Sequence, residues 1–468
     1  MEAANAAALP SFDTPRAIRT RDASRLRAYK DNLDFYEGAQ WPSISTRYSR
    51  YNQQRRLTLN LTRTFITKSA AYVMDGVSLA VDAPDDTDAQ QQSAAAAELA
   101  LRQVGDQNGL DVVDFDNELS CSVFGDGAYK VTWDDEGAHV RVTTPDVRTL
   151  WAWRRVDDPL TLLRVAQRWD IDAGAATAIY DYAGSPRRKP VLIEDWTADT
   201  YTLWLDDKPV DRRPNPYGFV PYVLYPNIRE PGHEWGVSDV AGMRDAAIDL
   251  NRIMTQMSLI AELSGNPIAV LENVTDSTDI GVQPGAVWEL PEGAKAYVLD
   301  LLSKGGATAL HDQAQLVRQF LHDLAETPRT AFGDNDAGLS GVALKVSLDP
   351  LTKKVQRKRL IRSRAMATRS AMVLQLLAQY AGLDHAAAAM PVRVVWGDVN
   401  PNDSSRDLAD AVLAAGAGVR SRRGAMSDLG TPDPDTELER WLQENALIAV
   451  RPPPAAPQQQ QRTTDAPR

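Results

Sequence analysis

The stretch TPRTAFGDNDAGLSGVALKVSLDP, residues 327–350, interrupts a long run of helical periodicity. Before it, apolar residues recur at alternating spacings of four and three from Leu310 to Leu324, which is the repeat of a helix with one apolar stripe. The Thr-Pro pair ends that helix, because the residue before a proline is pushed out of the helical region. Three glycines then make a flexible loop around Asp334 and Asp336. Such a loop is usually a surface turn between packed helices, so the neighbouring segments decide its role.

The helix before the loop, residues 307–326, also has a polar stripe opposite its apolar one. The polar stripe consists of Asp312, Gln315, Gln319, His322 and Glu326. A second apolar periodicity predicts a helix of similar length over 236–263, and short β-like runs with Gly and Pro turns occupy 264–305. The pattern indicates an elongated antiparallel helix pair with a small β tip. One face of the later helix packs, and the other can face water.

The helix after the loop is predicted over 342–380, with a kink near Ser347 because Pro350 lies inside it. Between Pro350 and Leu383 there is no Asp or Glu, although the whole chain carries a formal charge of −12. The basic residues there are Lys353, Lys354, Arg357, Lys358, Arg359, Arg362, Arg364 and Arg369. They fall on all sides of a helix, which leaves internal salt bridges, intersubunit salt bridges and contact with nucleic acid open.

The remaining segments predict an α+β protein of two or more domains. Helices are expected near 23–36, 60–74 and 111–124, followed by a hairpin at 128–144 and strands near 163–170, 191–196 and 201–205. A strand at 392–399 and two or three short amphipathic helices follow the basic helix. The two ends, 1–25 and 448–468, are rich in Ala, Pro, Gln and Thr and are expected to be disordered.

Signals for chemistry are weak. The single cysteine, Cys121, excludes an internal disulfide and lies in an apolar context that favours a small buried side chain. His233-Glu234 lacks a second histidine four residues on, and Gly125-Asp-Gly precedes a strand without the Lys of a phosphate-binding loop. No run reaches the length of a membrane span, and the N-terminus lacks the order of a secretion signal, so we expect no membrane association. We therefore expect no catalytic centre, no metal and no cofactor.

Five segments taken in order resemble the portal (head-to-tail connector) proteins of tailed double-stranded DNA phages, particularly those with long non-contractile tails. The segments are FGDGAYKVTWDDEG (124–137), IEDWTADTYTLWLDD (193–207), NPYGFVPYVLYPN (215–227), HEWGVSDVAGMRDAAIDLNRI (233–253) and SGVALKVSLDPLTKKVQRKR (340–359). The resemblance covers about residues 26–445 and rests on their number and order rather than on any one motif.

The resemblance implies the portal fold and its divisions. These are the wing (26–238), the stem helices (239–263 and 306–326), the clip (264–305), the tunnel loop (327–341), a long wing helix and strand (342–400) and the crown (401–447). It also implies a ring of twelve subunits at one capsid vertex, through which double-stranded DNA is packaged and ejected. The implied partners are further copies of the chain, the DNA, the terminase large subunit, the head-tail adaptor, and the scaffold and major capsid proteins. The implied location is the virion, after assembly in the host cytoplasm.

The resemblance also assigns candidate residues. The tunnel loop would present Arg329, Asp334, Asn335 and Asp336, and the polar stripe of 307–326 would face the tunnel. An acidic lining suits DNA that must move, because each cation on a phosphate releases counterions and adds affinity. Lys353, Lys354, Arg357, Lys358, Arg359, Arg362 and Arg364 would tie acidic subunits together. The alternative is a non-viral DNA-binding or clamp-like protein that uses the basic helix 353–369 on phosphates.

Overall fold

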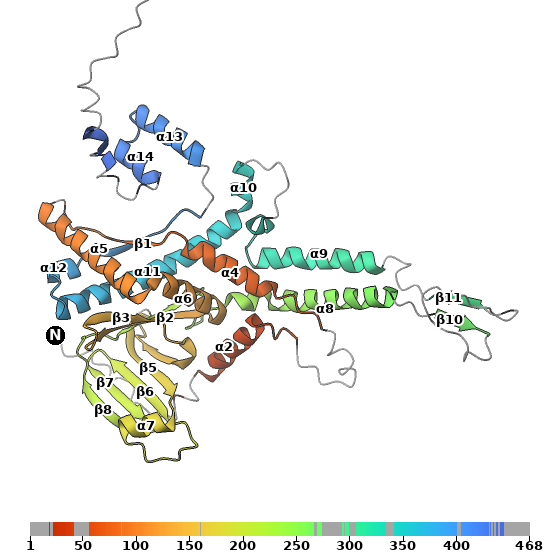
Figure 1. Ribbon diagram of the computed structural model, residues 1–468, viewed down its shortest axis with the longest axis horizontal. Helices are drawn as coiled ribbons and strands as arrows, with labels where there is room; N and C mark the ends of the chain where they lie inside the picture. The colour runs from red at the N-terminus through yellow and green to blue at the C-terminus, as the bar shows by residue number, and fades with distance from the viewer. Residues whose placement is uncertain are drawn as a thin grey trace, which may run out of the picture. The chain divides into compact units, whose positions relative to one another are not determined.

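The computed structural model shows a protein that mixes helix and sheet, which confirms the α+β class (Figure 1). The residues described are 18, 22–41, 56–85, 87–159, 161–265, 269–273, 293, 295–298, 306–333, 341–399, 404–429, 431, 434, 437, 438 and 440–443. Almost all of the two predicted disordered ends therefore lies outside the described residues. The chain divides into two compact units, residues 1–399 and 400–468.

The first unit begins with helices and then builds its sheets. Its elements up to the helix pair are α2 (Ala23–Tyr36), α4 (Leu61–Met74), β1 (Ser78–Val81), α5 (Asp88–Asn108), α6 (Leu110–Phe124), β2 (Asp126–Asp134), β3 (His139–Thr143), η1 (Val147–Thr149), β4 (Leu150–Arg154), β5 (Leu162–Asp170), α7 (Ala173–Tyr180), β6 (Val191–Thr197), β7 (Thr200–Leu205), β8 (Lys208–Pro214) and β9 (Tyr222–Pro226). The rest are α8 (Asp239–Gly265), β10 (Ala269–Glu272), β11 (Lys295–Val298), α9 (Gly306–Leu324), η2 (Arg329–Phe332), α10 (Gly341–Ser347), α11 (Asp349–Tyr380), α12 (His385–Ala388) and β12 (Val392–Val395).

The sheets of the first unit are antiparallel. One has three strands in the order β3-β2-β9, and another has five in the order β4-β5-β6-β7-β8. β1 pairs with β12, which joins residues 78–81 to residues 392–395. The long helix α11 packs on β2 and β9 and on the helices α4 and α5. The basic helix of the sequence therefore runs through the body of the unit rather than along its edge (Figure 1).

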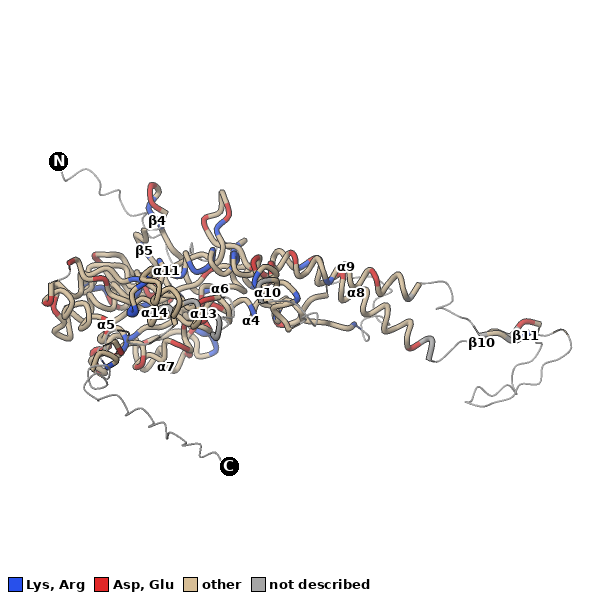
Figure 2. The backbone as a smooth tube through the Cα atoms, turned by 90° about the horizontal axis from the view of Figure 1, so that it is seen from above, with Lys and Arg blue, Asp and Glu red and all other residues tan. Residues whose placement is uncertain are grey.

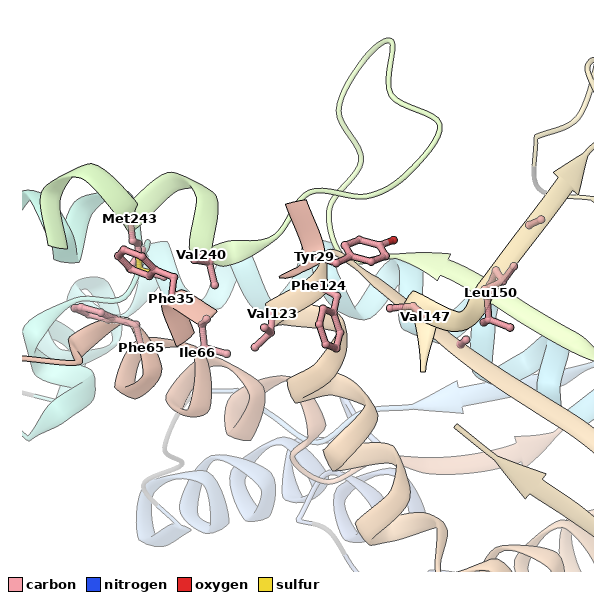
Figure 3. Close-up of a cluster of buried hydrophobic side chains, with 14 of the residues drawn as sticks. Tyr29, Phe35, Phe65, Ile66, Val123, Phe124, Val147, Leu150, Val240 and Met243 are labelled. Atoms are coloured by element: carbon pink, nitrogen blue, oxygen red, sulfur yellow. The ribbon is translucent and has the colours of Figure 1, made fainter. Parts of the chain in front are cut away.

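An aromatic core joins the N-terminal helices to the start of the helix pair. Tyr29, Phe35, Phe65 and Phe124 are all buried in one cluster with Met243 of α8 (Figure 3). Aromatic side chains bury the largest apolar areas, so a few of them suffice to fix α2, α4 and α6 against one end of α8. The base of the helix pair is therefore part of the main core.

α8 and α9 lie side by side as the sequence predicted (Figure 1). The apolar stripe of α9 supplies the contact: Ala314 and Leu321 are buried in the same cluster as Leu250, and Leu310 and Val317 pack against it. β10 and β11 form the antiparallel ribbon between the two helices in sequence. Most of the predicted β tip, 264–305, lies outside the described residues.

Two glycines bring distant segments into backbone contact. Gly125 ends α6 with φ +105°, and Gly236 lies in the segment that leads into α8. A Cβ on Gly236 would lie 2.0 Å from the carbonyl oxygen of Gly125. Asp126 fixes the contact, because its Oδ1 accepts a hydrogen bond from the Gly236 N–H at 2.9 Å. Two of the segments that carry the portal resemblance, FGDG and HEWG, therefore meet at this point.

α9 ends in a tight hydrogen-bonded cap before the loop. The Thr327 N–H donates to the carbonyl of His322 at 3.0 Å, and the Glu326 N–H donates to that of Asp323 at 3.1 Å. This is the Schellman pattern, with Glu326 at φ +49° in the left-handed position that glycine usually fills. The helix stops two residues before the predicted end. The left-handed backbone conformation of Glu326 ends it, in addition to the Thr-Pro pair.

The predicted kink near Ser347 is present as a break between helices. α10 ends at Ser347 and α11 begins at Asp349, with Pro350 in the first turn of α11. Proline is tolerated there because the first N–H groups of a helix have no partner within it.

The described residues of the second unit are largely helical. They form α13 (Ser404–Gly416) and α14 (Arg422–Asp428), which pack on one another. The ring of Trp441 lies beneath the guanidinium of Arg422, 3.9 Å from its Cζ.

Candidate functional site

The polar stripe of α9 is exposed over part of its length. Asp312, Gln315 and Gln319 are all exposed, and Asp312 retains 71% of its side-chain surface. They line a groove of about 760 Å³ together with residues of η2 and Ser347. Figure 2 shows acidic and basic positions interspersed along α8 and α9, so neither helix presents a strip of one charge sign.

His322 does not face solvent, which corrects the expectation for this member of the stripe. Its residue surface is only 8% exposed. The ring lies edge-on to Phe65 at 4.9 Å and to Phe332 at 5.5 Å. Nδ1 donates a hydrogen bond to the Thr327 carbonyl at 2.8 Å. His322 therefore fastens the end of α9 to α4 and η2.

Glu326 and Arg357, which the sequence placed in different roles, bind one another. Both carboxylate oxygens of Glu326 accept hydrogen bonds from the Arg357 guanidinium at 2.6 Å. The pair is partly exposed, with 61% of the Arg357 side chain accessible. Surface pairs of this kind contribute little to stability, but this one neutralises the acid that was expected to line the tunnel. Arg329 is exposed at the start of η2 and lines the same groove as Gln319. The other three tunnel-loop candidates, Asp334, Asn335 and Asp336, lie outside the described residues.

The basic residues of α11 form a buried ion cluster, which we call the α11 ion cluster. It consists of Lys354, Lys358, Arg362, Glu118 and Asp239. Arg362 donates to both oxygens of Glu118, at 2.7 and 3.0 Å, and is 1% exposed. Lys358 donates to Asp239 at 2.5 Å, and Lys354 donates to the Ala325 carbonyl at 2.9 Å. One stripe of α11 therefore contacts α6, the first turn of α8 and the carbonyl that directly follows the end of α9.

Burial and opposite charges act against one another on the pKa values of the ion cluster. Burial alone would raise the pKa of Asp239, but the ammonium groups of Lys358 and Lys354 hold that pKa well below its ordinary value. Burial lowers the pKa of Lys354, with Asp239 opposing the shift. Burial would also lower the pKa of Arg362, yet the carboxylate of Glu118 raises it. Each cation of the cluster lies within 3.9 Å of a carboxylate, which is the partner that a buried charge requires.

Other cations of α11 are also satisfied inside the subunit. Arg359 donates to the backbone carbonyls of Tyr72, Val73 and Asp75 at 2.9–3.0 Å, which satisfies the open end of α4. Arg369 is 3% exposed and bonds to Asp114 of α6. Residues 350–380 of α11 contain no acid, and the acids that pair with its cations come from other elements.

This geometry corrects the expectation for most of the basic helix. Lys354, Lys358, Arg359 and Arg362 have internal partners and are buried, so they cannot reach a neighbouring subunit or a DNA phosphate in this fold. The exposed positions, Lys353, Arg357 and Arg364, remain open to either contact. A clamp-like DNA-binding role that depends on the whole set 353–369 loses its support. The sequence contained one signal that could have predicted these internal ion pairs. A long helical stretch with cations and no acids has to pair any buried cation with acids from elsewhere in the chain.

His322 makes the stability of this region depend on pH. Burial lowers its pKa below the ordinary 6.5, and the nearby Arg318 and Arg329 lower it further, while the Thr327 carbonyl and Asp323 oppose the shift. As the pH falls, His322 therefore binds a proton in the unfolded chain before it does so in the folded chain. The free energy of unfolding then decreases as pH decreases below about 6.5. We expect the urea midpoint to drop from pH 7 to pH 5.5 by more in the wild type than in a His322→Gln variant. Equal drops in the two proteins would contradict this assignment.

The described residues offer neither a membrane-spanning helix nor a metal site. No described helix is both long enough and apolar enough to cross a membrane. No group of three or more His, Cys, Asp or Glu side chains in the described part of the chain is placed to hold a metal ion.

Comparison with known proteins agrees with the order of the segments. The model of the family described as phage portal protein, SPP1 Gp6-like, matches residues 16–449. No curated protein matches the chain. The family match covers nearly the whole sequence, including α8, α9, the loop and α11. The chain therefore belongs to the SPP1 Gp6-like family of phage portal proteins.

Proposed function

We propose that the chain assembles into a closed ring at one capsid vertex and that double-stranded DNA passes through the ring during packaging and ejection. The observation that carries the proposal is the packed α8–α9 pair, in which one face of α9 is buried against α8 and another exposes Asp312, Gln315 and Gln319. In a ring, rotational symmetry repeats each exposed residue as a circle. Family membership supports the same arrangement.

The exposed face of α9 has a chemistry that suits sliding DNA. Its groove is lined by Asp312 and Asp323 as well as by Arg318 and Arg329, so acids offset the cations. Because affinity for DNA rises with each cation that neutralises a phosphate, such a mixed surface binds duplex only weakly. Glu326, paired with Arg357, adds no unpaired charge of either sign. Asp334, Asn335 and Asp336 would extend this lining as the tunnel loop.

The finer assignments extend from the same proposal. Residues 26–238 would form the wing, 401–447 the crown and 264–305 the clip that meets the terminase large subunit and later the head-tail adaptor. Twelve subunits, contacts with the scaffold and major capsid proteins, location at the virion vertex and assembly in the host cytoplasm follow from the family. Lys353, Arg357 and Arg364 are the members of the basic helix that could contact a neighbouring subunit.

Electron microscopy of the purified protein tests the ring directly. We expect negatively stained particles with a central hole, and a mass by light scattering that is a multiple of the 51.4 kDa chain. Fluorescence titration with duplex DNA should show weak binding. Monomers at all protein concentrations, together with tight, salt-sensitive DNA binding, would instead favour the clamp-like function.

The loop is tested by replacing residues 334–340 with a Gly-Ser segment of equal length. Ala331 is buried and Phe332 packs edge-on to Phe65, so the replacement must spare η2. We expect rings of wild-type appearance but a loss of packaged or retained DNA of at least tenfold, measured as DNase-resistant genomes. Loss of the rings would show that the segment is architectural, and full packaging would remove its role at the tunnel.

A further inference from the structure

A pocket between α2, η1 and the five-stranded sheet takes no part in the proposed function. Its volume is about 490 Å³. The strand register places Trp151, Arg168 and Val191 on one face of the sheet, because Cα partners and residues two apart along a strand share a face. The residues that line the pocket are Leu26, Arg148, Trp151, Arg168, Asp170, Lys189 and Val191.

Two N–H groups from this lining are buried without an acceptor in the described part of the chain. They are the indole N–H of Trp151, a residue that is 2% exposed, and the Nε–H of Arg168. The indole N–H of Trp196 also lacks an acceptor, but Trp196 lies in the main core. Buried donors are normally paired, so two unpaired donors in the lining of one pocket call for an acceptor that the described residues do not supply.

The pocket also holds a cation that no acid neutralises. Arg168 donates to Asp170 at 2.7 Å. Arg148 donates to Asp146 at 2.7 Å. Lys189 is exposed and forms no ion pair within the described residues. One ammonium and two N–H groups therefore remain for a ligand, and an acceptor with negative charge suits all three.

We propose that this pocket binds a phosphate group. A phosphate group carries three strong acceptor oxygens and a charge of about −1.5 to −2, so it can accept from the indole, the guanidinium and the ammonium together. A carboxylate brings two oxygens and one charge, and so matches the three donors less well. The pocket has the volume of small-ligand sites, which admits inorganic phosphate or a nucleotide. The site lies within one copy of the chain and does not depend on a ring.

Isothermal titration calorimetry with inorganic phosphate, at constant ionic strength, tests the proposal. We expect saturable binding to the wild type. Trp151→Phe keeps an aromatic ring but removes the N–H, so its Kd should be about tenfold higher, as for the loss of one hydrogen bond to a charged acceptor. Lys189→Gln changes an exposed side chain and should also raise the Kd while folding as the wild type does.

Trp196→Phe is the matched control, because it removes an unpaired indole N–H in the main core. Its Kd should equal that of the wild type. No saturable binding would show that water alone fills the pocket, and would overturn the proposal. An unchanged Kd in Lys189→Gln and Trp151→Phe would overturn it as well, and Lys189→Gln alone decides if circular dichroism shows Trp151→Phe to be misfolded.

Adenosine monophosphate in place of inorganic phosphate identifies the source of the phosphate group. Tighter binding than that of inorganic phosphate, with the same dependence on Lys189, would assign the site to a nucleotide. Equal or weaker binding would assign it to free phosphate.

Discussion

Replacing Arg362 with alanine is expected to destabilise the protein by about 3–5 kcal/mol, because Glu118 would keep a buried charge without its main partner. Arg362 is 1% exposed and also donates to the carbonyl and side-chain oxygens of Asn227, at 2.6 and 2.7 Å. Its loss leaves buried acceptors without a donor in α6 and in the segment that follows β9. Urea unfolding followed by circular dichroism should show the decrease as a shifted midpoint.

Arg364→Ala is the matched control, since Arg364 lies on the same helix with its side chain exposed. Its effect should stay within about 0.5 kcal/mol. A double variant, Glu118→Leu with Arg362→Met, should recover part of the loss because it removes both charges together. Equal midpoints for Arg362→Ala and Arg364→Ala would show that the α11 ion cluster does not hold the fold.

Alanine at Gly236 should be nearly as damaging, although it adds a single methyl group. The new Cβ would lie 2.0 Å from the Gly125 carbonyl oxygen and 2.9 Å from the Asn227 nitrogen. Both are backbone atoms of a hydrogen-bonded joint, in which the Asn227 N–H donates to the Gly125 carbonyl at 2.7 Å. Neither can withdraw without breaking that joint, so we expect a loss of about 3 kcal/mol or more and a large insoluble fraction.

Gly242→Ala provides the contrast on α8. Nothing lies within 4 Å of the Cβ that it would add. A glycine in a helix interior costs about 1 kcal/mol relative to alanine, so this variant should be more stable than the wild type. Thermal unfolding of the two variants side by side should therefore shift in opposite directions. A neutral Gly236→Ala would mean that the α6–α8 joint can open without cost.

Much of the helical architecture follows from periodicity. α2 coincides with its predicted range, and α4, α6, α8 and α9 begin and end within about three residues of theirs. The residues in them repeat strongly at helical spacing, and glycines or prolines mark their ends. α5 was not predicted, because its run of Gln and Ala has few large apolar residues, and only Ala94, Ala97, Leu101 and Val104 are buried. The edge strand β8 was missed for a related reason: KPVDRRP is exposed and contains two prolines.

The candidate site was harder to predict from the sequence, because it depends on contacts between residues that are distant in the chain. The polar stripe of α9 was visible at helical spacing, but the burial of His322 depends on Phe65, more than 250 positions earlier in the chain. The basic residues of α11 were noticed as a charge imbalance. That Glu118 and Asp239 neutralise them could not be inferred, since neither acid is near α11 in sequence. Helical spacing indicates which residues share a face, but it does not identify what that face contacts.

Lys354 has a mechanical consequence for the helix pair. Its ammonium lies 2.9 Å from the Ala325 carbonyl beyond the end of α9 and 3.9 Å from the Asp239 carboxylate at the start of α8. Sliding one helix past the other by a single residue, about 1.5 Å, would pull this buried cation away from one of the two groups. Shear between α8 and α9 is thereby opposed at the base. A force on the end of the helix pair away from the core should therefore move α8 and α9 together as one rigid body. The bending should occur at the base, where the pair joins the core.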